Sequence, residues 1–262
     1  MRAKQWPTTA VLVGLVVLGL AGVVSVAACE PDRAGGDDAA SVAGAGGGLE
    51  DLTPEQVLEK ARQAGAELTS LRGTIRQQRK AGTLEYSLSV TRDGDCTGTV
   101  SEDGVEAEVR RHGGTVWVKP SASMFQAALP DAGPALADKW LTGTGELGKS
   151  YAGYCDLVFR LATGDGPLKA VGEWTKTGVR PVSGTRAVFL GFRSGEGGPH
   201  GSSGMVAIAA EGQPYLLSAN ETGDSATAIR FDAFGKPVEV TPPSADETAD
   251  ASGHRIVLDG NR

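Results

Sequence analysis

Alternating apolar and polar residues at positions 84–91 constrain the fold of this chain more than any other feature of its sequence. Leu84, Tyr86, Leu88 and Val90 occupy every second position, with charged or hydroxyl side chains between them. Successive side chains of a β-strand point to opposite faces, so this period of two indicates a strand with one apolar and one wet face. Such strands are typical of an antiparallel sheet that is covered on one side only.

Turn-forming dipeptides punctuate the sequence after this strand. Asp-Gly or Gly-Gly pairs end at Gly94, Gly104 and Gly114, and pairs of this kind favour tight hairpin turns. The strands expected between and after these turns span residues 96–101, 105–111 and 115–119. Together these segments predict an antiparallel meander.

A helix is expected before the strands. Thr53 is a good N-cap, Pro54 suits the first helical turn, and Gln56 stands three residues after the cap, as in a capping box. Apolar residues then recur at steps of three and four, and Gly73 is expected to end the helix. This stripe consists of Val57, Ala61, Ala64, Leu68 and Leu71.

The middle of the chain changes character before strands resume. Helical patterns are expected around residues 124–129, 136–141 and 154–161. Further strands are expected near residues 173–181, 186–193, 204–209, 214–221 and 226–232. The order of helix, strands, helices and strands predicts the α+β class with one large antiparallel sheet.

The first 28 residues have the three regions of a secretory signal. Arg2 and Lys4 give a basic start, an apolar run follows, and residues 26–28 are small. The apolar run has about fifteen residues, fewer than the roughly twenty that a membrane-spanning helix needs. Residues 1–28 are therefore expected to be a cleaved lipoprotein signal peptide.

Cys29 follows this signal directly. The sequence Val-Ala-Ala-Cys at residues 26–29 resembles the bacterial lipobox, which implies a diacylglyceryl lipid on Cys29 and a lipid anchor on the extracytoplasmic face of the cell membrane. The Gly/Asp-rich stretch that follows has almost nothing apolar to bury, so residues 29–48 are expected to be a flexible tether. The alternative is a soluble secreted protein that is cut after Ala28 and keeps a free thiol.

The other two cysteines, Cys96 and Cys155, form an even pair once Cys29 is assigned to the lipid. In an oxidising compartment they are expected to form a disulfide, and two buried free thiols are the alternative. The three histidines are scattered and none stands at ligand spacing from a cysteine, so no metal site is expected.

No group of residues predicts catalysis. Gly143 to Gly148 matches a dinucleotide-binding fingerprint by letters alone, because no βαβ unit surrounds it. No nucleophile has a plausible base, so neither an enzyme nor a cofactor is expected. The net charge of −7 and the absence of a basic cluster argue against nucleic acid as a partner.

Short C-terminal pieces carry a family resemblance. Residues 212–217 (GQPYLL) and 228–243 (AIRFDAFGKPVEVTPP) resemble the closing strand-turn-strand of the LolA/LppX/LprG-like lipoprotein superfamily, and the surroundings of Cys96 and Cys155 resemble its actinobacterial members. This resemblance implies a strongly curved antiparallel half-barrel sheet with helices packed on its concave face. It also implies an apolar cavity between sheet and helices.

The resemblance implies a function as well. A membrane-anchored monomer would bind and carry lipids or lipidated molecules in the cell envelope, since a carrier must offer a dry slot to an acyl chain. A sensor or interaction module with a packed core is the alternative, and about 200 folded residues are short for a two-lobed solute-binding protein. The cavity candidates are Val57, Leu68, Leu71, Tyr86, Leu88, Val90, Trp117, Met124, Phe125, Leu157, Leu161, Phe189 and Phe231.

The expected domain organisation follows from these parts. The signal peptide at residues 1–28 and the lipidated tether at 29–48 precede a half-barrel domain at 49–246, and residues 247–262 form a C-terminal tail.

Overall fold

The computed structural model describes residues 48–80, 82–164, 166–169, 172–193, 203–222 and 226–254. All of them belong to the compact unit that begins at Ala45. The lipidation of Cys29, the signal peptide and all of the tether except Gly48 lie outside the described residues, so these three expectations stay predictions.

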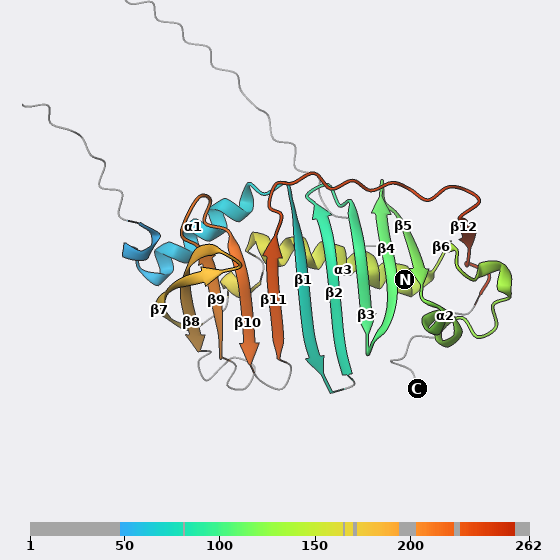
Figure 1. Cartoon of the computed structure of the whole chain (residues 1–262), viewed down its shortest axis with the longest axis horizontal. Coiled ribbons are helices and arrows are strands. Elements are labelled where there is room, and N and C mark those ends of the chain that lie inside the picture. The colour runs from blue at the N-terminus through green and yellow to red at the C-terminus, as the bar shows by residue number, and fades with distance from the viewer. Residues whose placement is uncertain are drawn as a thin grey trace, which may run out of the picture. The chain divides into compact units, whose positions relative to one another are not determined.

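The strands of the described residues form a single twelve-stranded sheet (Figure 1). Their order across the sheet is β12-β6-β5-β4-β3-β2-β1-β11-β10-β9-β8-β7. Their bounds are β1 Ser70–Arg79, β2 Gly82–Thr91, β3 Cys96–Glu102, β4 Val105–His112, β5 Thr115–Pro120, β6 Trp140–Thr142, β7 Glu173–Val182, β8 Thr185–Arg193, β9 Ser203–Ala209, β10 Leu216–Thr222, β11 Thr227–Asp232 and β12 Thr248–Asp250. Neighbouring strands are antiparallel except β12 and β6, which are parallel. The expected α+β class is confirmed, with a mixed sheet.

Three α-helices accompany the sheet in the described part of the chain. They are α1 Pro54–Ala66, α2 Ala122–Ala128 and α3 Gly145–Thr163, with short 3₁₀ turns at Leu49–Asp51, Pro134–Leu136 and Pro167–Lys169. The helices predicted near residues 124–129 and 154–161 are confirmed as α2 and α3. The helix predicted near 136–141 is wrong, because a short 3₁₀ turn ends at Leu136 and the chain enters the sheet as β6 at Trp140.

The start of α1 is as predicted and its end is not. Gln56 donates its backbone N–H to the Thr53 hydroxyl at 3.3 Å, and Thr53 N–H donates to the Gln56 side chain at 2.9 Å, which completes the capping box. The helix ends at Ala66, however, and Gly73 lies inside β1. Leu71 and Gly73 are buried and alternate with more exposed residues, as expected for a β-strand. The predicted helix therefore included residues that belong to β1.

The hairpins of the sheet match the predicted strands closely. The meander β2 to β5 forms with the expected turns, and β7 to β11 form near the five positions expected for the later strands. β1 was missed and is central, since it pairs with β2 on one side and with β11 on the other. It thereby joins the N-terminal and C-terminal groups of strands into one sheet.

The last described residues also belong to the sheet. The segment after β11 crosses the ends of strands β1 to β5 before it forms β12 (Figure 1). Backbone hydrogen bonds tie it there, such as Gly235 N–H to the Ser70 carbonyl at 2.9 Å. Within the segment 247–262, expected as a tail, the described residues 247–254 thus contribute strand β12 and the fully buried Ala251.

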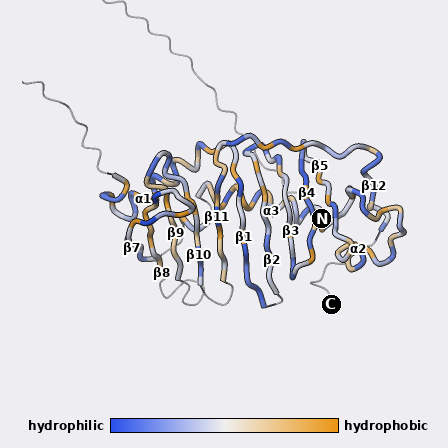
Figure 2. Tube along the Cα trace, in the orientation of Figure 1, coloured by the Kyte–Doolittle hydropathy of each residue, from blue (hydrophilic) through white to orange (hydrophobic). Residues whose placement is uncertain are grey.

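The two faces of the sheet differ in their cover. One face, here called the helix face, carries α3 across β1, β2 and β5, and α1 packs against α3 and β7 (Figure 1). The opposite face is called the outer face. On β1 to β4 the residues of the outer face are polar and at least partly exposed, as at Arg72, Ser87 and Thr99. Figure 2 colours these strands by the hydropathy of each residue.

Candidate functional site

An apolar layer fills the space between the helices and the helix face. Val57 of α1, Leu88 of β2 and Val158 of α3 are each 0% exposed and belong to one continuous cluster. Burial of this kind stabilises a domain by about 0.8 kcal/mol for each methylene removed from water. The helices are therefore held to the sheet mainly by this layer.

Two glycines let α3 approach its neighbours closely. A Cβ atom on Gly73 of β1 would lie 2.5 Å from Cγ1 of Val158, and one on Gly65 of α1 would lie 3.0 Å from Cα of Thr163. The first distance is shorter than side-chain carbon atoms show in proteins, and the second is tight, so a side chain at either position would push α3 away from its neighbour. α3 is thus seated against both β1 and α1.

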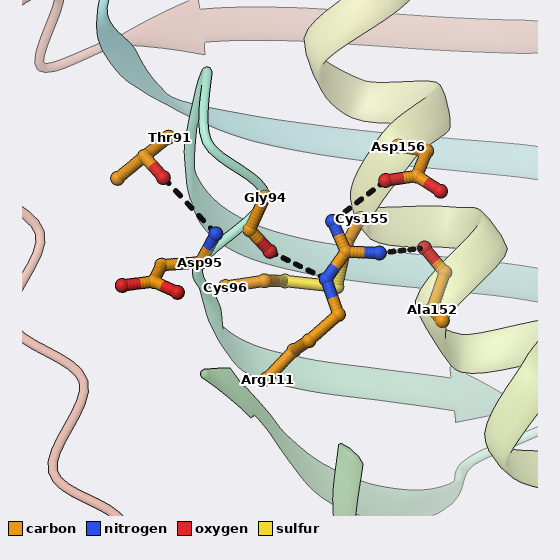
Figure 3. Close-up of a disulfide and its surroundings, with 8 residues drawn as sticks. All are labelled: Thr91, Gly94, Asp95, Cys96, Arg111, Ala152, Cys155 and Asp156. Carbon is orange, nitrogen blue, oxygen red and sulfur yellow. Dashed lines mark hydrogen bonds and ion pairs between the residues drawn. A yellow bond between two sulfur atoms is a disulfide. The ribbon is translucent and has the colours of Figure 1, made fainter. Parts of the chain in front are cut away.

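A disulfide and an arginine fix the middle of α3 (Figure 3). Cys96 at the start of β3 is bonded to Cys155 of α3, with Cα atoms 6.0 Å apart, which confirms the predicted pairing. Arg111 of β4 donates to the Ala152 carbonyl at 3.1 Å, to Asp156 Oδ1 at 2.6 Å and to the Gly94 carbonyl. The Arg111 side chain is 12% exposed and that of Asp156 is 59% exposed, so water still screens this ion pair from the side of Asp156.

Ten of the thirteen cavity candidates lie together in or against the apolar layer. Seven of them are buried in it: Val57, Leu68, Leu71, Tyr86, Leu88, Val90 and Phe231. Met124, Leu157 and Leu161 pack against it and are partly exposed. The apolar faces of the predicted elements were therefore sufficient to find most of this layer.

Three candidates lie elsewhere. Phe189 belongs to a separate cluster with Ala187 and Ala207 on the outer face, because β8 turns its even-numbered side chains to the helices. Phe125 packs against a small cluster near α2. Trp117 neighbours Val118 of the helix-face cluster and pairs with Arg110, so it points to the outer face. These three positions are corrections to the predicted cavity wall.

An aromatic group within the layer was not predicted as a whole. The rings of Tyr86 and Tyr154 stack with centroids 5.0 Å apart, and the centroids of Tyr151 and Tyr154 are 6.0 Å apart. The Tyr151 hydroxyl donates to the Met124 sulfur at 3.6 Å. Tyr154 stands three and seven residues before Leu157 and Leu161, so helical spacing was the signal that could have found it.

Burial changes the chemistry of two of these phenols. It raises the pKa of Tyr86 to about 12, and it raises the pKa of Tyr151 above its ordinary value. Both hydroxyls therefore stay neutral at physiological pH. The apolar layer therefore contains two uncharged hydroxyl groups.

The layer reaches the surface along one side of α3. Tyr154, Leu157 and Leu161 are each partly exposed, whereas Cys155 and Val158 on the neighbouring positions are buried. Met124 of α2 is likewise partly exposed beside Tyr151. An apolar molecule that met this side of α3 would find side chains continuous with the core.

Within the described ranges, no group of three or more His, Cys, Asp or Glu side chains could hold a metal ion. No helix in those ranges is both long and apolar enough to cross a membrane.

Comparison with known proteins shows a shared fold. No protein-family model matches the chain, and neither does any curated protein. Among solved structures, LprF from Mycobacterium bovis is 13% identical over 73% of this chain and 97% of its own, with a TM-score of 0.53. The lipoprotein LppX from Mycobacterium tuberculosis is 18% identical over 72% of this chain and 100% of its own, with a TM-score of 0.48. A LolA superfamily protein from Nitrosomonas europaea is 10% identical over 73% and 96%, with a TM-score of 0.25.

The likeness to LprF covers nearly all of that protein and concerns the fold alone, given the low identity. The resemblance to the LolA/LppX/LprG-like superfamily that the short C-terminal pieces carry is thereby confirmed at the level of the fold.

Proposed function

We propose that this chain is a lipoprotein, anchored through Cys29 to the extracytoplasmic face of the cell membrane, that binds and carries an acyl chain between helices α1 and α3 and the sheet. The acyl chain could belong to a lipid or to a lipidated molecule. The tether of residues 29–48 would hold the domain near the membrane, since a flexible segment as long as its nineteen residues after Cys29 reaches about 25 Å on average.

The partly exposed apolar side of α3 is the observation that carries this proposal. Leu157 and Leu161 lie at the boundary between the buried layer and water, so they offer an apolar entrance to the layer. An acyl chain that leaves a bilayer loses about 0.8 kcal/mol for each methylene exposed to water. Movement of the Leu157 and Leu161 side chains would open the dry layer to such a chain while α3 stays in place.

The strand irregularities support a curved sheet around this layer. Register shifts occur between Lys176 and Gly178 in β7 and between Leu216 and Ser218 in β10. Bulges of this kind bend strands and increase their twist. The proposal therefore includes a half-barrel whose concave side is the helix face.

The disulfide and the fold support the proposed location. Disulfides such as Cys96–Cys155 persist in oxidising compartments, which indicates an extracytoplasmic protein. The similar fold of LppX belongs to a protein described as a lipoprotein. The lipid on Cys29 would supply the membrane attachment, and two acyl chains on one residue give a lasting anchor.

The test is native mass spectrometry of the secreted chain with Cys29→Ser, so that bound lipid is not confused with attached lipid. We expect an added mass in the range of an acylated molecule, and uptake of a fluorescent fatty acid. Leu157→Asp should reduce both, because a carboxylate at the entrance resists desolvation. Ser150→Asp, on an exposed position of the same helix, is the matched control.

A sensor or interaction module with a packed core is the second candidate. The full burial of Val57, Leu88 and Val158 favours it, since these side chains leave little space at the centre of the layer. Absence of bound mass and of probe uptake, with both variants behaving like the parent chain, would select this candidate.

A further inference from the structure

A second apolar surface lies on the outer face, where an antiparallel sheet is usually wet. Ala187, Phe189, Ala207, Ala209 and Leu217, here called the outer cluster, are each at most 8% exposed. They come from β8, β9 and β10. The sheet lies between the helix-face layer and the outer cluster, and Phe234, which follows β11, packs against both of them.

A pocket of about 360 Å³ lies beside the outer cluster. Ala209 and Leu217 contribute its apolar floor, where the small Ala209 leaves room. Tyr215 and Phe234 form an aromatic wall, with stacked rings whose centroids are 4.6 Å apart. A flat apolar group of a ligand fits between such a wall and floor.

Charged side chains of both signs also line this pocket. Arg230 and Asp232 stand two residues apart on β11, both exposed, and Glu211 stands on the loop before β10. Side chains at this spacing on one strand face are about 7 Å apart. Among the described residues, no hydrogen bond or ion pair engages these three side chains. A cation and carboxylates are therefore presented separately, rather than neutralising each other.

We propose that this pocket binds a zwitterionic amino acid with an aromatic side chain. The ligand carboxylate would meet the Arg230 guanidinium, its ammonium would meet Asp232 or Glu211, and its ring would pack against Phe234 over Ala209. The volume lies at the lower end of the range of about 300–1,000 Å³ for ligand pockets, which fits one amino acid and is too small for a diacyl lipid.

The test is titration of the full chain carrying Cys29→Ser with L-phenylalanine and with phenylalaninamide, followed by NMR shifts of backbone amides. We expect shifts at Leu217, Arg230 and Phe234, and tighter binding of phenylalanine than of its amide. Arg230→Gln should weaken phenylalanine binding about tenfold and remove this preference, because it removes a charge-assisted contact. Ala209→Leu should abolish binding by filling the floor.

Arg76→Gln is the matched control, since Arg76 lies exposed on the same face of β1 and does not line the pocket. It should bind both compounds like the parent chain. The proposal is overturned if phenylalanine causes no shifts at millimolar concentration, or if Arg230→Gln and Arg76→Gln change binding equally. Because Arg230 is exposed, its variant should fold even where Ala209→Leu does not.

Discussion

The two halves of the sheet bury apolar side chains in different ways. In β1 to β4 the apolar residues face α3, and the outer face is polar, as at Ser87 and Thr99. In β8 to β10 both faces are apolar, since Val188 and Ile208 face the helices whereas Phe189 and Leu217 form the outer cluster. The first half thus buries apolar side chains only on the face that α3 covers. The second half buries apolar side chains on both faces.

We expect the two halves of the sheet to have different roles. The first half holds α3 by the Cys96–Cys155 disulfide and by Arg111, so it supplies a fixed frame for the helix-face layer. The second half offers an additional apolar surface beside a pocket with charged walls. The predictions below test this division.

Removal of the disulfide should have the largest effect, and it should act on the first half. The double variant Cys96→Ala with Cys155→Ala opens a loop that spans 59 residues of sequence separation. On the chain-entropy model the free energy of unfolding should fall by about 4 kcal/mol. Urea unfolding measures this change, and a loss under about 1 kcal/mol would show that the layer and Arg111 suffice to hold α3.

Truncation of Phe189 should show that the second half has a core on its outer face. Phe189→Ala should lower the free energy of unfolding by about 3 kcal/mol, because the ring is almost fully buried. Thr99→Ala, on the outer face of the first half, should change it by less than about 0.5 kcal/mol. Equal effects in denaturant unfolding would remove the distinction between the two halves.

Addition of one methyl group at Gly73 should disturb the seat of α3. Gly73→Ala should cost about 2 kcal/mol, because its Cβ would overlap Val158. Combined with Val158→Ala, the same substitution should cost clearly less, as contacting residues are not additive. Gly133→Ala, with open space around it and a φ of −70°, should be neutral in the same unfolding experiment. Full additivity at Gly73 and Val158 would contradict the contact.

Titration of Tyr86 should give the smallest effect. The folded-state pKa of about 12 exceeds the ordinary value of 10.0, so the folded chain holds the proton more tightly. The protonated Tyr86 therefore stabilises the fold fully below pH 10, and this stabilisation is lost as the pH rises toward 12. At pH 11 the free energy of unfolding should have fallen by about 1 kcal/mol. Tyr86→Phe should lessen the fall in stability above pH 10. An unchanged pH profile in this variant would place the titration elsewhere.

The same contrast explains what could be predicted from the sequence. The meander of the first half was predicted because its outer face is polar, so the period of two is plain in residues 84–91. In β8 the residues on both faces are apolar, so the sequence does not show which face Phe189 occupies, and Phe189 was assigned to the wrong one. The disulfide followed from an even pair of cysteines and needed no geometry.

Local patterns also misled at element boundaries. Leu68 and Leu71 continue the helical spacing of α1, although the helix ends at Ala66 and Leu71 already lies in β1. β6 and β12 have three residues each, too few for a period to be recognised. The pocket beside the outer cluster joins residues of β9, β10 and β11 with a loop, so only the folded chain brings them together.

Photocrosslinking tests the central claim, acyl binding at the helix face, most directly. The secreted chain with Cys29→Ser would be irradiated with a fatty acid that carries a diazirine near its end, and the labelled peptides would be mapped by mass spectrometry. The account predicts labels in α3, around Tyr154 to Leu161, and in β2 around Tyr86 and Leu88. Labels confined to β9 and β10 on the outer face, or no saturable labelling, would contradict it.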